Sequence, residues 1–198
     1  MEEKKIDICI PCLVKNTEAY RIKKANFLKL IGIPVNNILI SSKKGLANAR
    51  NDLMKKTATE WFLFLDDDIV LNKKWWKKIS RYMDSDKIGA ICGFGLPDST
   101  ALIILRHLFL MRGLRHQRGF ASNTLIKKKA VEGIILTREG RLEDLELQEK
   151  IKAKGYEWKF CLAYCRHTKK PGKVFAEAFS DFIKIKKEKG IFKAIMSI

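Results

Sequence analysis

Apolar and polar positions along the chain follow two patterns in turn: short apolar runs, and longer stretches with apolar residues three or four positions apart. The first pattern is typical of strands and the second of helices. We expect strands at 6–11, 37–40, 61–65, 88–92 and 158–165, and helices at 18–31, 46–57, 72–83 and 142–155. Their alternation predicts a single α/β domain with a mostly parallel sheet that is flanked by helices.

The run WFLFL at 61–65 is the most apolar of the expected strands. A strand that is covered on both faces needs no polar alternation, so we expect this one at the centre of the sheet with parallel neighbours. In the helix at 18–31, the spacing places Ile22, Ala25 and Lys29 on one face.

The net charge narrows the class of partner. The chain carries 40 Lys and Arg against 22 Asp and Glu, a formal charge of +18. This favours an anionic partner: a nucleic acid, a phosphorylated small molecule or an acidic lipid surface. The first residues, MEEKKIDICIPC, lack a signal-peptide pattern, so we expect a cytoplasmic protein. The apolar segment 100–113 is interrupted by Arg106 and His107 and is too short to span a bilayer.

The five cysteines do not form a dense disulfide framework. Cys9 lies in an alternating strand pattern, so the CIPC sequence indicates core thiols more than a redox pair. Cys161 and Cys165 also lie in an apolar run, and with His167 their spacing fits no common zinc motif. An internal disulfide stays open if the source is a hyperthermophile, where abundant Lys, Ile and Glu are also expected.

Three consecutive aspartates, Asp66 to Asp68, directly follow the most apolar strand. In open α/β sheets, ligands bind beyond the carboxyl ends of the strands. Strand alternation sends Asp66 and Asp68 to one side, where they can share a divalent cation or divide between a ribose and a cation. Asp67 then points away and holds the loop. The alternative is an acidic cluster that favours the dipole of the following helix.

A second acidic pair opens the helix expected at 142–155. Asp144 shares the inward face with Leu147 and Ile151, whereas Glu143 is turned about 100° away. Asp144 is therefore placed to take up a proton from a substrate. An exposed acid in the first helical turn is the alternative.

Arg50 lies among the apolar positions of the helix at 46–57. A guanidinium is unfavourable there unless it has a partner of opposite charge. Both a nucleotide and a salt bridge to one of the aspartates would supply that partner.

These motifs occur in an order that resembles the family 2 glycosyltransferases. The succession is IPC after the first strand, GLANARND, FLDDD, GFASN, LEDLELQEKIKAKGYEW and then His167, over nearly the whole chain. Each motif alone is common, but the ordered set is specific. The resemblance implies a GT-A fold and an inverting transfer of a sugar from a nucleoside-diphosphate sugar to an acceptor hydroxyl. The acceptor would be a glycan, a protein or a lipid-linked molecule.

The resemblance also implies roles for individual residues. Asp144 would be the catalytic base, steadied by Glu143, and Asp66, Asp68 and His167 would hold Mn²⁺ or Mg²⁺ at the sugar diphosphate. Residues of the motifs and two lysines would bind the donor nucleotide sugar: Pro11, Cys12, Arg50, Asp66, Asp67, Gly119, Ser122, Lys169 and Lys170.

By the same resemblance, the single domain divides into a nucleotide-sugar half at 1–95 and an acceptor and catalytic half at 96–170. The last segment, 171–198, is basic and amphipathic, with Phe175 and Phe179 on one side of an expected helix. It either packs on the domain or lies on an anionic membrane surface, which would place the enzyme at the cytoplasmic face of a membrane.

Two departures from the family leave the base of the donor open. Leu13 and Val14 stand where an aromatic residue and Asn are usual, and Ser41 stands where an Asp reads uracil.

Two other classes of function also stay open. The same carboxylates would serve a two-metal nuclease or phosphotransferase, although the chain has no nucleic-acid motif and no specific nucleic-acid partner is expected. The other class is a GT-A-like binding protein without catalysis.

Overall fold

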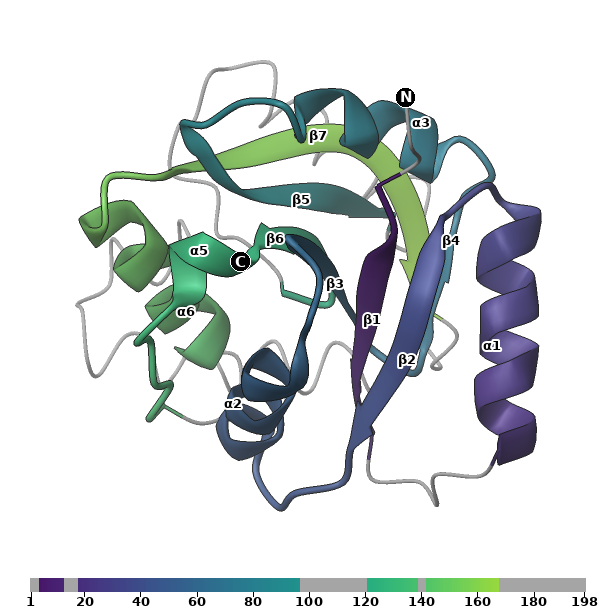
Figure 1. The fold of residues 1–198 in the computed structure, drawn as a ribbon, viewed down its shortest axis with the longest axis horizontal. Helices are drawn as coiled ribbons and strands as arrows, with labels where there is room; N and C mark the ends of the chain where they lie inside the picture. The colour runs from purple at the N-terminus through teal and green to yellow at the C-terminus, as the bar shows by residue number, and fades with distance from the viewer. Residues whose placement is uncertain (1–3, 13–17, 97–120, 139–141, 168–198) are drawn as a thin grey trace.

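Two layers of helices enclose a curved seven-stranded sheet in the computed structural model, which describes residues 4–12, 18–96, 121–138 and 142–167 (Figure 1). The strands are β1 (Ile6–Pro11), β2 (Val35–Ser41), β3 (Trp61–Leu65), β4 (Ile69–Leu71), β5 (Ile88–Leu96), β6 (Asn123–Lys127) and β7 (Glu157–His167). The helices are α1 (Glu18–Leu30), α2 (Leu46–Lys56), α3 (Trp75–Ile79), the 3-10 helix η1 (Ser80–Tyr82), α5 (Lys128–Val131) and α6 (Leu142–Ala153).

The sheet is mixed. Within the described residues the strand order is β2-β1-β3-β6-β5-β7-β4. β1 pairs in parallel with β2 and β3, as β5 does with β7. β6 runs antiparallel to both β3 and β5, and β4 runs antiparallel to β7. The prediction of a mostly parallel sheet is therefore only partly right, because β6 enters the middle of the sheet in the opposite direction to its neighbours.

Strand alternation divides the core into two clusters. Ile8 of β1 and Leu63 of β3 face one cluster, to which α1 and α3 contribute, whereas Cys9 and Phe64 face the other, with α2, α5 and α6. All five residues of β3 are buried. Burial on both faces explains the unbroken WFLFL run, and the prediction of a central strand is confirmed. One of its neighbours, β1, is parallel and the other, β6, is antiparallel.

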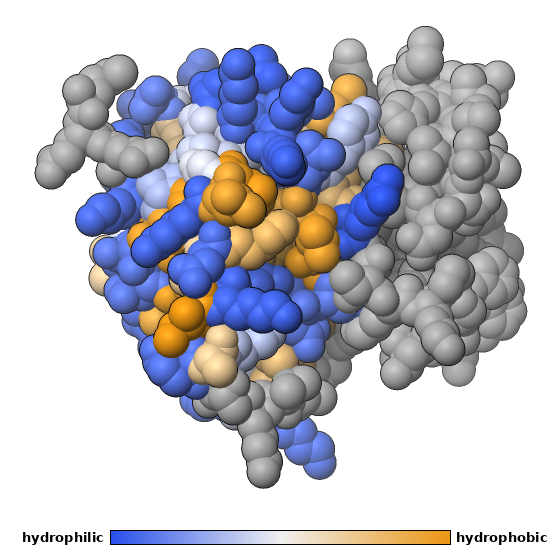
Figure 2. Space-filling model, turned by 90° about the vertical axis from the view of Figure 1, so that its right-hand side faces the viewer, coloured by the Kyte–Doolittle hydropathy of each residue, from blue (hydrophilic) through white to orange (hydrophobic). Residues whose placement is uncertain are grey.

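Helix α1 covers the edge of the sheet beside β2 (Figure 1). Its buried residue is Leu28, whereas Ile22 is 53% exposed and Lys29 is also exposed. The face expected to carry Ile22, Ala25 and Lys29 is thus turned largely outward. Figure 2, a view from the side of α1, shows apolar side chains in the middle of this side of the molecule with hydrophilic ones around them.

The remaining expectations concern the helix at 72–83, the cysteines and the membrane. The helix begins only at Trp75 and continues as a 3-10 turn from Ser80. All five cysteines are free and buried, in agreement with the prediction of core thiols. None of the helices in the described ranges combines the length and the apolar character needed to cross a bilayer.

Candidate functional site

Carboxylates from two distant segments meet around Arg50 of α2. Its Nη1 donates hydrogen bonds to Oε1 of Glu143 and Oδ1 of Asp144, both in the first turn of α6. Its Nη2 donates to Oδ1 of Asp66, after β3, at 3.4 Å. One guanidinium therefore joins the acidic turn to the start of α6.

Arg50 is buried because of its place on α2. Ala47, Leu53 and Met54 also lie on the inner face of the helix, so the helical period directs Arg50 inward, where it is 1% exposed. Its Cζ lies over the ring of Phe64, 5.6 Å from the ring centroid. The predicted alternative of a salt bridge to an aspartate is confirmed. Binding of a nucleotide by Arg50 stays a prediction.

The three aspartates form a turn and not the end of a strand, because β3 ends at Leu65 and the N–H of Ile69 donates to the backbone oxygen of Asp66 at 3.2 Å. The argument from strand alternation therefore does not apply to them. Asp66 faces Arg50, whereas Oδ2 of Asp67 accepts a hydrogen bond from Sγ of Cys12 at 3.4 Å. The turn thus connects the end of β1 with α2.

The site holds more negative than positive charge. Burial raises the pKa of Glu143, and Asp144 adds to this effect while Arg50 opposes it. Burial also raises the pKa of Asp66, against the opposing effect of Arg50. The Glu143 side chain is fully buried, and its Oε2 has no hydrogen-bond partner among the described residues. A single guanidinium among three carboxylates leaves the site able to bind a proton or a further cation.

The donor atoms of the acidic turn fit a divalent cation. Carboxylate oxygens are the ligands that Mg²⁺ and Mn²⁺ prefer. No three His, Cys, Asp or Glu side chains in the described ranges form a ready cage for a metal ion. Mg²⁺ is often bound by one or two carboxylates together with substrate phosphates and water, and the binding of a cation by Asp66 and Asp68 stays a prediction.

The third predicted metal ligand, His167, is the last residue of β7. His167 pairs with Ile69, the residue directly after the turn. Its backbone therefore lies next to the acidic turn, and its role as a metal ligand stays a prediction.

Backbone groups connect other predicted residues to the site. Pro11 ends β1 and pairs with Ser41, and the oxygen of Ser122 accepts a hydrogen bond from the N–H of Asp66 at 3.1 Å. The N–H of Ala121, which the sequence did not single out, donates to Oδ1 of Asp144 at 3.2 Å. The predicted residues that lie outside the described ranges are Gly119, Lys169, Lys170 and those of the tail at 171–198.

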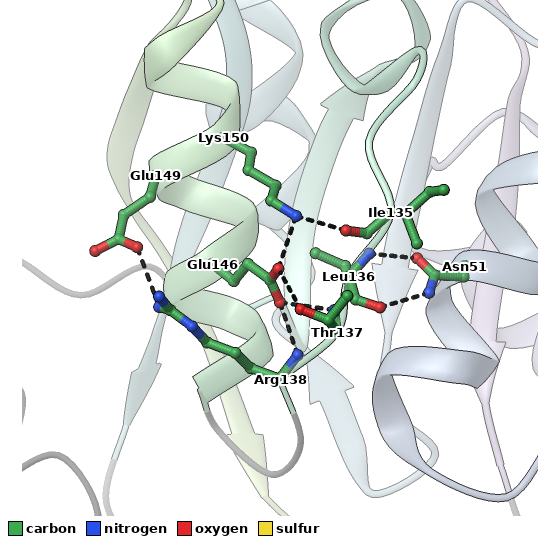
Figure 3. Close-up of polar contacts among 8 residues, drawn as sticks. All are labelled: Asn51, Ile135, Leu136, Thr137, Arg138, Glu146, Glu149 and Lys150. Carbon is green, nitrogen blue, oxygen red and sulfur yellow. Dashed lines mark hydrogen bonds and ion pairs between the residues drawn. The ribbon is translucent and has the colours of Figure 1, made fainter. Parts of the chain in front are cut away.

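Helices α2 and α6 are also tied to each other through segment 134–138 (Figure 3). Asn51, next to Arg50, donates to the backbone oxygen of Leu136 and accepts from its N–H, both at 2.8 Å. Glu146 of α6 accepts from the next two backbone N–H groups, each at 2.9 Å. These bonds fix the position of Arg50 relative to the acidic residues of α6. A cavity of about 510 Å³ between α2 and this segment includes none of the carboxylates that contact Arg50.

Sequence reasoning missed Lys24 of α1. Its Nζ donates to the backbone oxygen of Ile69 at 3.3 Å. Burial lowers the pKa of Lys24, and the charges of Asp67, Asp68 and Asp66 raise it. Nothing in the local pattern distinguishes this lysine from its exposed neighbour Lys23.

The sequence of the chain matches a known protein family. The model of the family described as Glycosyl transferase family 2 matches residues 25–134, more than half of the chain. A comparison with curated proteins finds no match.

Two solved structures are similar in fold. Glucosyl-3-phosphoglycerate synthase from Mycobacterium tuberculosis, in complex with Mn²⁺, UDP and phosphoglyceric acid, has a TM-score of 0.63 at 11% identity, over 95% of this chain and 78% of that one. Mannosyltransferase PcManGT from Pyrobaculum calidifontis, in complex with GDP-Man and Mn²⁺, has a TM-score of 0.65 at 12% identity, over 97% of this chain and 69% of that one. At this level of identity, the similarity establishes the fold.

Proposed function

Because the chain belongs to glycosyltransferase family 2, we propose that this glycosyltransferase moves a sugar from a nucleoside-diphosphate sugar to an acceptor hydroxyl, with inversion at the anomeric carbon. The observation that carries the proposal is the contact of Arg50 with both Asp66 and Asp144. Transfer requires donor ligands and a base within one site, and here the two acidic segments lie on either side of one guanidinium.

The structural relatives support the donor class and the cation. The synthase binds Mn²⁺ and UDP, and the mannosyltransferase binds GDP-Man and Mn²⁺. In this chain, Asp66 and Asp68 would hold the cation, and Arg50, Cys12 and Asp67 would line the donor site. The relatives carry two different bases, and Ser41 leaves the base of this donor open.

Different residues of the chain have different roles in the transfer. Asp144 takes the proton of the acceptor hydroxyl, whose oxygen attacks the anomeric carbon while the bond from that carbon to the diphosphate oxygen breaks. The electron pair of the broken bond leaves with the nucleoside diphosphate, and a divalent cation held by Asp66 and Asp68 would supply positive charge there. Arg50 and the N–H of Ala121 orient Asp144. Glu143 positions Arg50 and does not touch substrate, because its side chain is fully buried.

The proposed acceptor is defined only by its class, as a hydroxyl of a glycan, a protein or a lipid-linked molecule. Contact of segment 171–198 with a membrane and the division into halves at 1–95 and 96–170 stay predictions.

Thermal unfolding with nucleoside diphosphates and their sugars, with and without Mn²⁺, tests the proposal. Ligand at a hundred times its Kd should stabilise the native state by about 2.7 kcal/mol. We expect this for Mn²⁺ together with one nucleotide, and its loss in Asp68→Asn. Asp84→Asn, at an exposed aspartate that pairs with Lys4, is the matched control and should keep the effect. A wild type that no nucleotide stabilises would contradict the proposal, and stabilisation by DNA or RNA would favour the nuclease alternative.

A further inference from the structure

The acidic turn has a cationic neighbour on a different element. Lys24 belongs to α1, and its Nζ donates to the backbone oxygen of Ile69. Ile69 begins β4 directly after the three aspartates, and its N–H closes the turn onto Asp66. The ammonium group therefore lies against the same turn that carries the predicted ligands of the metal and the donor.

The charges that act on Lys24 come from this turn. Asp67, Asp68 and Asp66 are the carboxylates whose fields reach it. Among the described residues, however, Lys24 forms no ion pair with any of them. An ammonium group has three N–H donors, and the hydrogen bond to Ile69 uses one. Lys24 therefore keeps donors and charge for a further acceptor near the turn.

The packing of α1 does not require a cation at this position. The helix is anchored in the core through Leu28, and its other lysines, Lys23 and Lys29, are exposed. Partial burial of a lysine costs desolvation and side-chain entropy, and one bond to a backbone oxygen offsets little of that cost. A bound ligand that contacts the ammonium group would offset the rest of this cost.

We infer that Lys24 is a further donor-binding residue, whose ammonium group contacts the diphosphate of the nucleotide sugar. The inference rests on the proposed function. Lysine binds phosphate as a compact point charge, and a diphosphate keeps negative charge beside one divalent cation. When the bond to the anomeric carbon breaks, its electron pair remains on the diphosphate, and Lys24 stabilises that charge without giving up a proton. Lys24 precedes the residues 25–134 that the family model matches, so the match does not assign it.

Calorimetric titration of purified variants tests the assignment. Mn²⁺ alone is titrated first, followed by UDP or GDP, whichever stabilises the wild type, in the presence of Mn²⁺. In Lys24→Gln we expect the nucleotide Kd to rise about tenfold, since one charge-assisted contact is lost. The Kd for Mn²⁺ alone should fall a few-fold, since a positive charge near the metal ligands is removed. Lys24→Arg should keep most of the nucleotide affinity, and Lys23→Gln should change neither value.

A rise in the nucleotide Kd together with a fall in the Mn²⁺ Kd would distinguish ligand binding by Lys24 from a structural role. If Lys24 only ties α1 to β4, Lys24→Gln should lower the thermal midpoint and either weaken both ligands together or change neither, and the assignment would be overturned. Absence of nucleotide binding in the wild type overturns the proposed function and the assignment with it. Binding by the wild type with an equal Kd in Lys24→Gln overturns the assignment alone.

Discussion

Two sets of carboxylates in this chain differ in how many hydrogen-bond donors they meet. Asp7, near the start of β1, is fully buried, and its oxygens accept from Nδ2 of Asn36 at 2.9 Å and from the N–H groups of Ala58 at 2.7 Å and Thr59 at 3.2 Å. Burial raises the pKa of Asp7, but these hydrogen bonds outweigh it, and the pKa is lowered. Around Arg50, by contrast, three carboxylates share one guanidinium.

The difference teaches how a structural acid can be told from a functional one. Asp7 has enough donors for its negative charge, so it needs no ligand and joins β1 to β2 and to the segment before β3. Oε2 of Glu143 has no donor among the described residues, Asp66 accepts from Arg50 at 3.4 Å, and burial raises the pKa of both acids. A buried site with unbalanced charge is costly for the fold alone and is typical of positions that bind substrate or a cation.

The largest expected effect concerns the chemistry at Asp144. Asp144→Asn should lower kcat by about 10²–10⁴-fold, because the amide cannot accept the proton of the acceptor. The donor Kd should change little. Initial rates of nucleoside-diphosphate release, with the donor that stabilises the wild type, would measure this. Asp7→Asn is the matched control and should keep the wild-type kcat. Activity close to wild type in Asp144→Asn would show that another group is the base, whereas a wild type that binds donor without turnover would favour the non-catalytic reading.

Removal of Arg50 should have the largest effect on stability. Arg50→Met leaves three carboxylates without their shared cation, and we expect the free energy of unfolding to fall by about 3–5 kcal/mol near pH 8. The deficit should shrink at lower pH, where protons replace the guanidinium. Urea unfolding at several pH values measures both effects. Arg138→Met, which removes an exposed pair with Glu149, is the control and should cost less than about 1 kcal/mol. Equal losses in both variants would contradict the special place of Arg50.

A smaller loss is expected at the satisfied acid. Asp7→Asn should lower the free energy of unfolding by about 1.5–3 kcal/mol at neutral pH, since charged hydrogen bonds are weakened. Because the pKa of Asp7 is lowered in the native state, its contribution is present above the ordinary value of 3.8 and is lost as pH falls. Wild-type and variant stabilities should therefore converge in acid. A loss of donor affinity in this variant would refute its purely structural role.

The last expected effect is a dependence of stability on pH at Glu143. Its pKa is raised in the native state, so the native protein keeps a proton that the unfolded chain loses as pH rises above 4.5. The contribution of Glu143 to stability should therefore decline with rising pH, by at most about 1.4 kcal/mol per pH unit. Glu143→Gln should remove this decline, as the difference between the two stability curves would reveal. Parallel curves would mean that Glu143 is not protonated in the native state.

Local pattern was sufficient for most elements of the fold. The apolar runs at β1 and β3 and the helical spacing of α2 predict these elements within one or two residues of their observed bounds. The predicted GT-A class is confirmed by the solved structures. Strands β4 and β6 were not predicted. Strand direction was not accessible either, because β6 looks the same in sequence whether it runs parallel or antiparallel to β3.

By itself, the sequence determined which groups are available for chemistry: three aspartates after the central strand, an acidic pair at the start of α6, and an arginine on the buried side of α2. Only the tertiary structure decided which of them meet. Arg50 and Asp144 are 94 residues apart along the chain, and their contact depends on how α2 and α6 pack on a curved, mixed sheet. The position of Lys24 beside Ile69 has the same origin. Periodicity depends on a few neighbouring residues, whereas these contacts depend on packing across the whole fold.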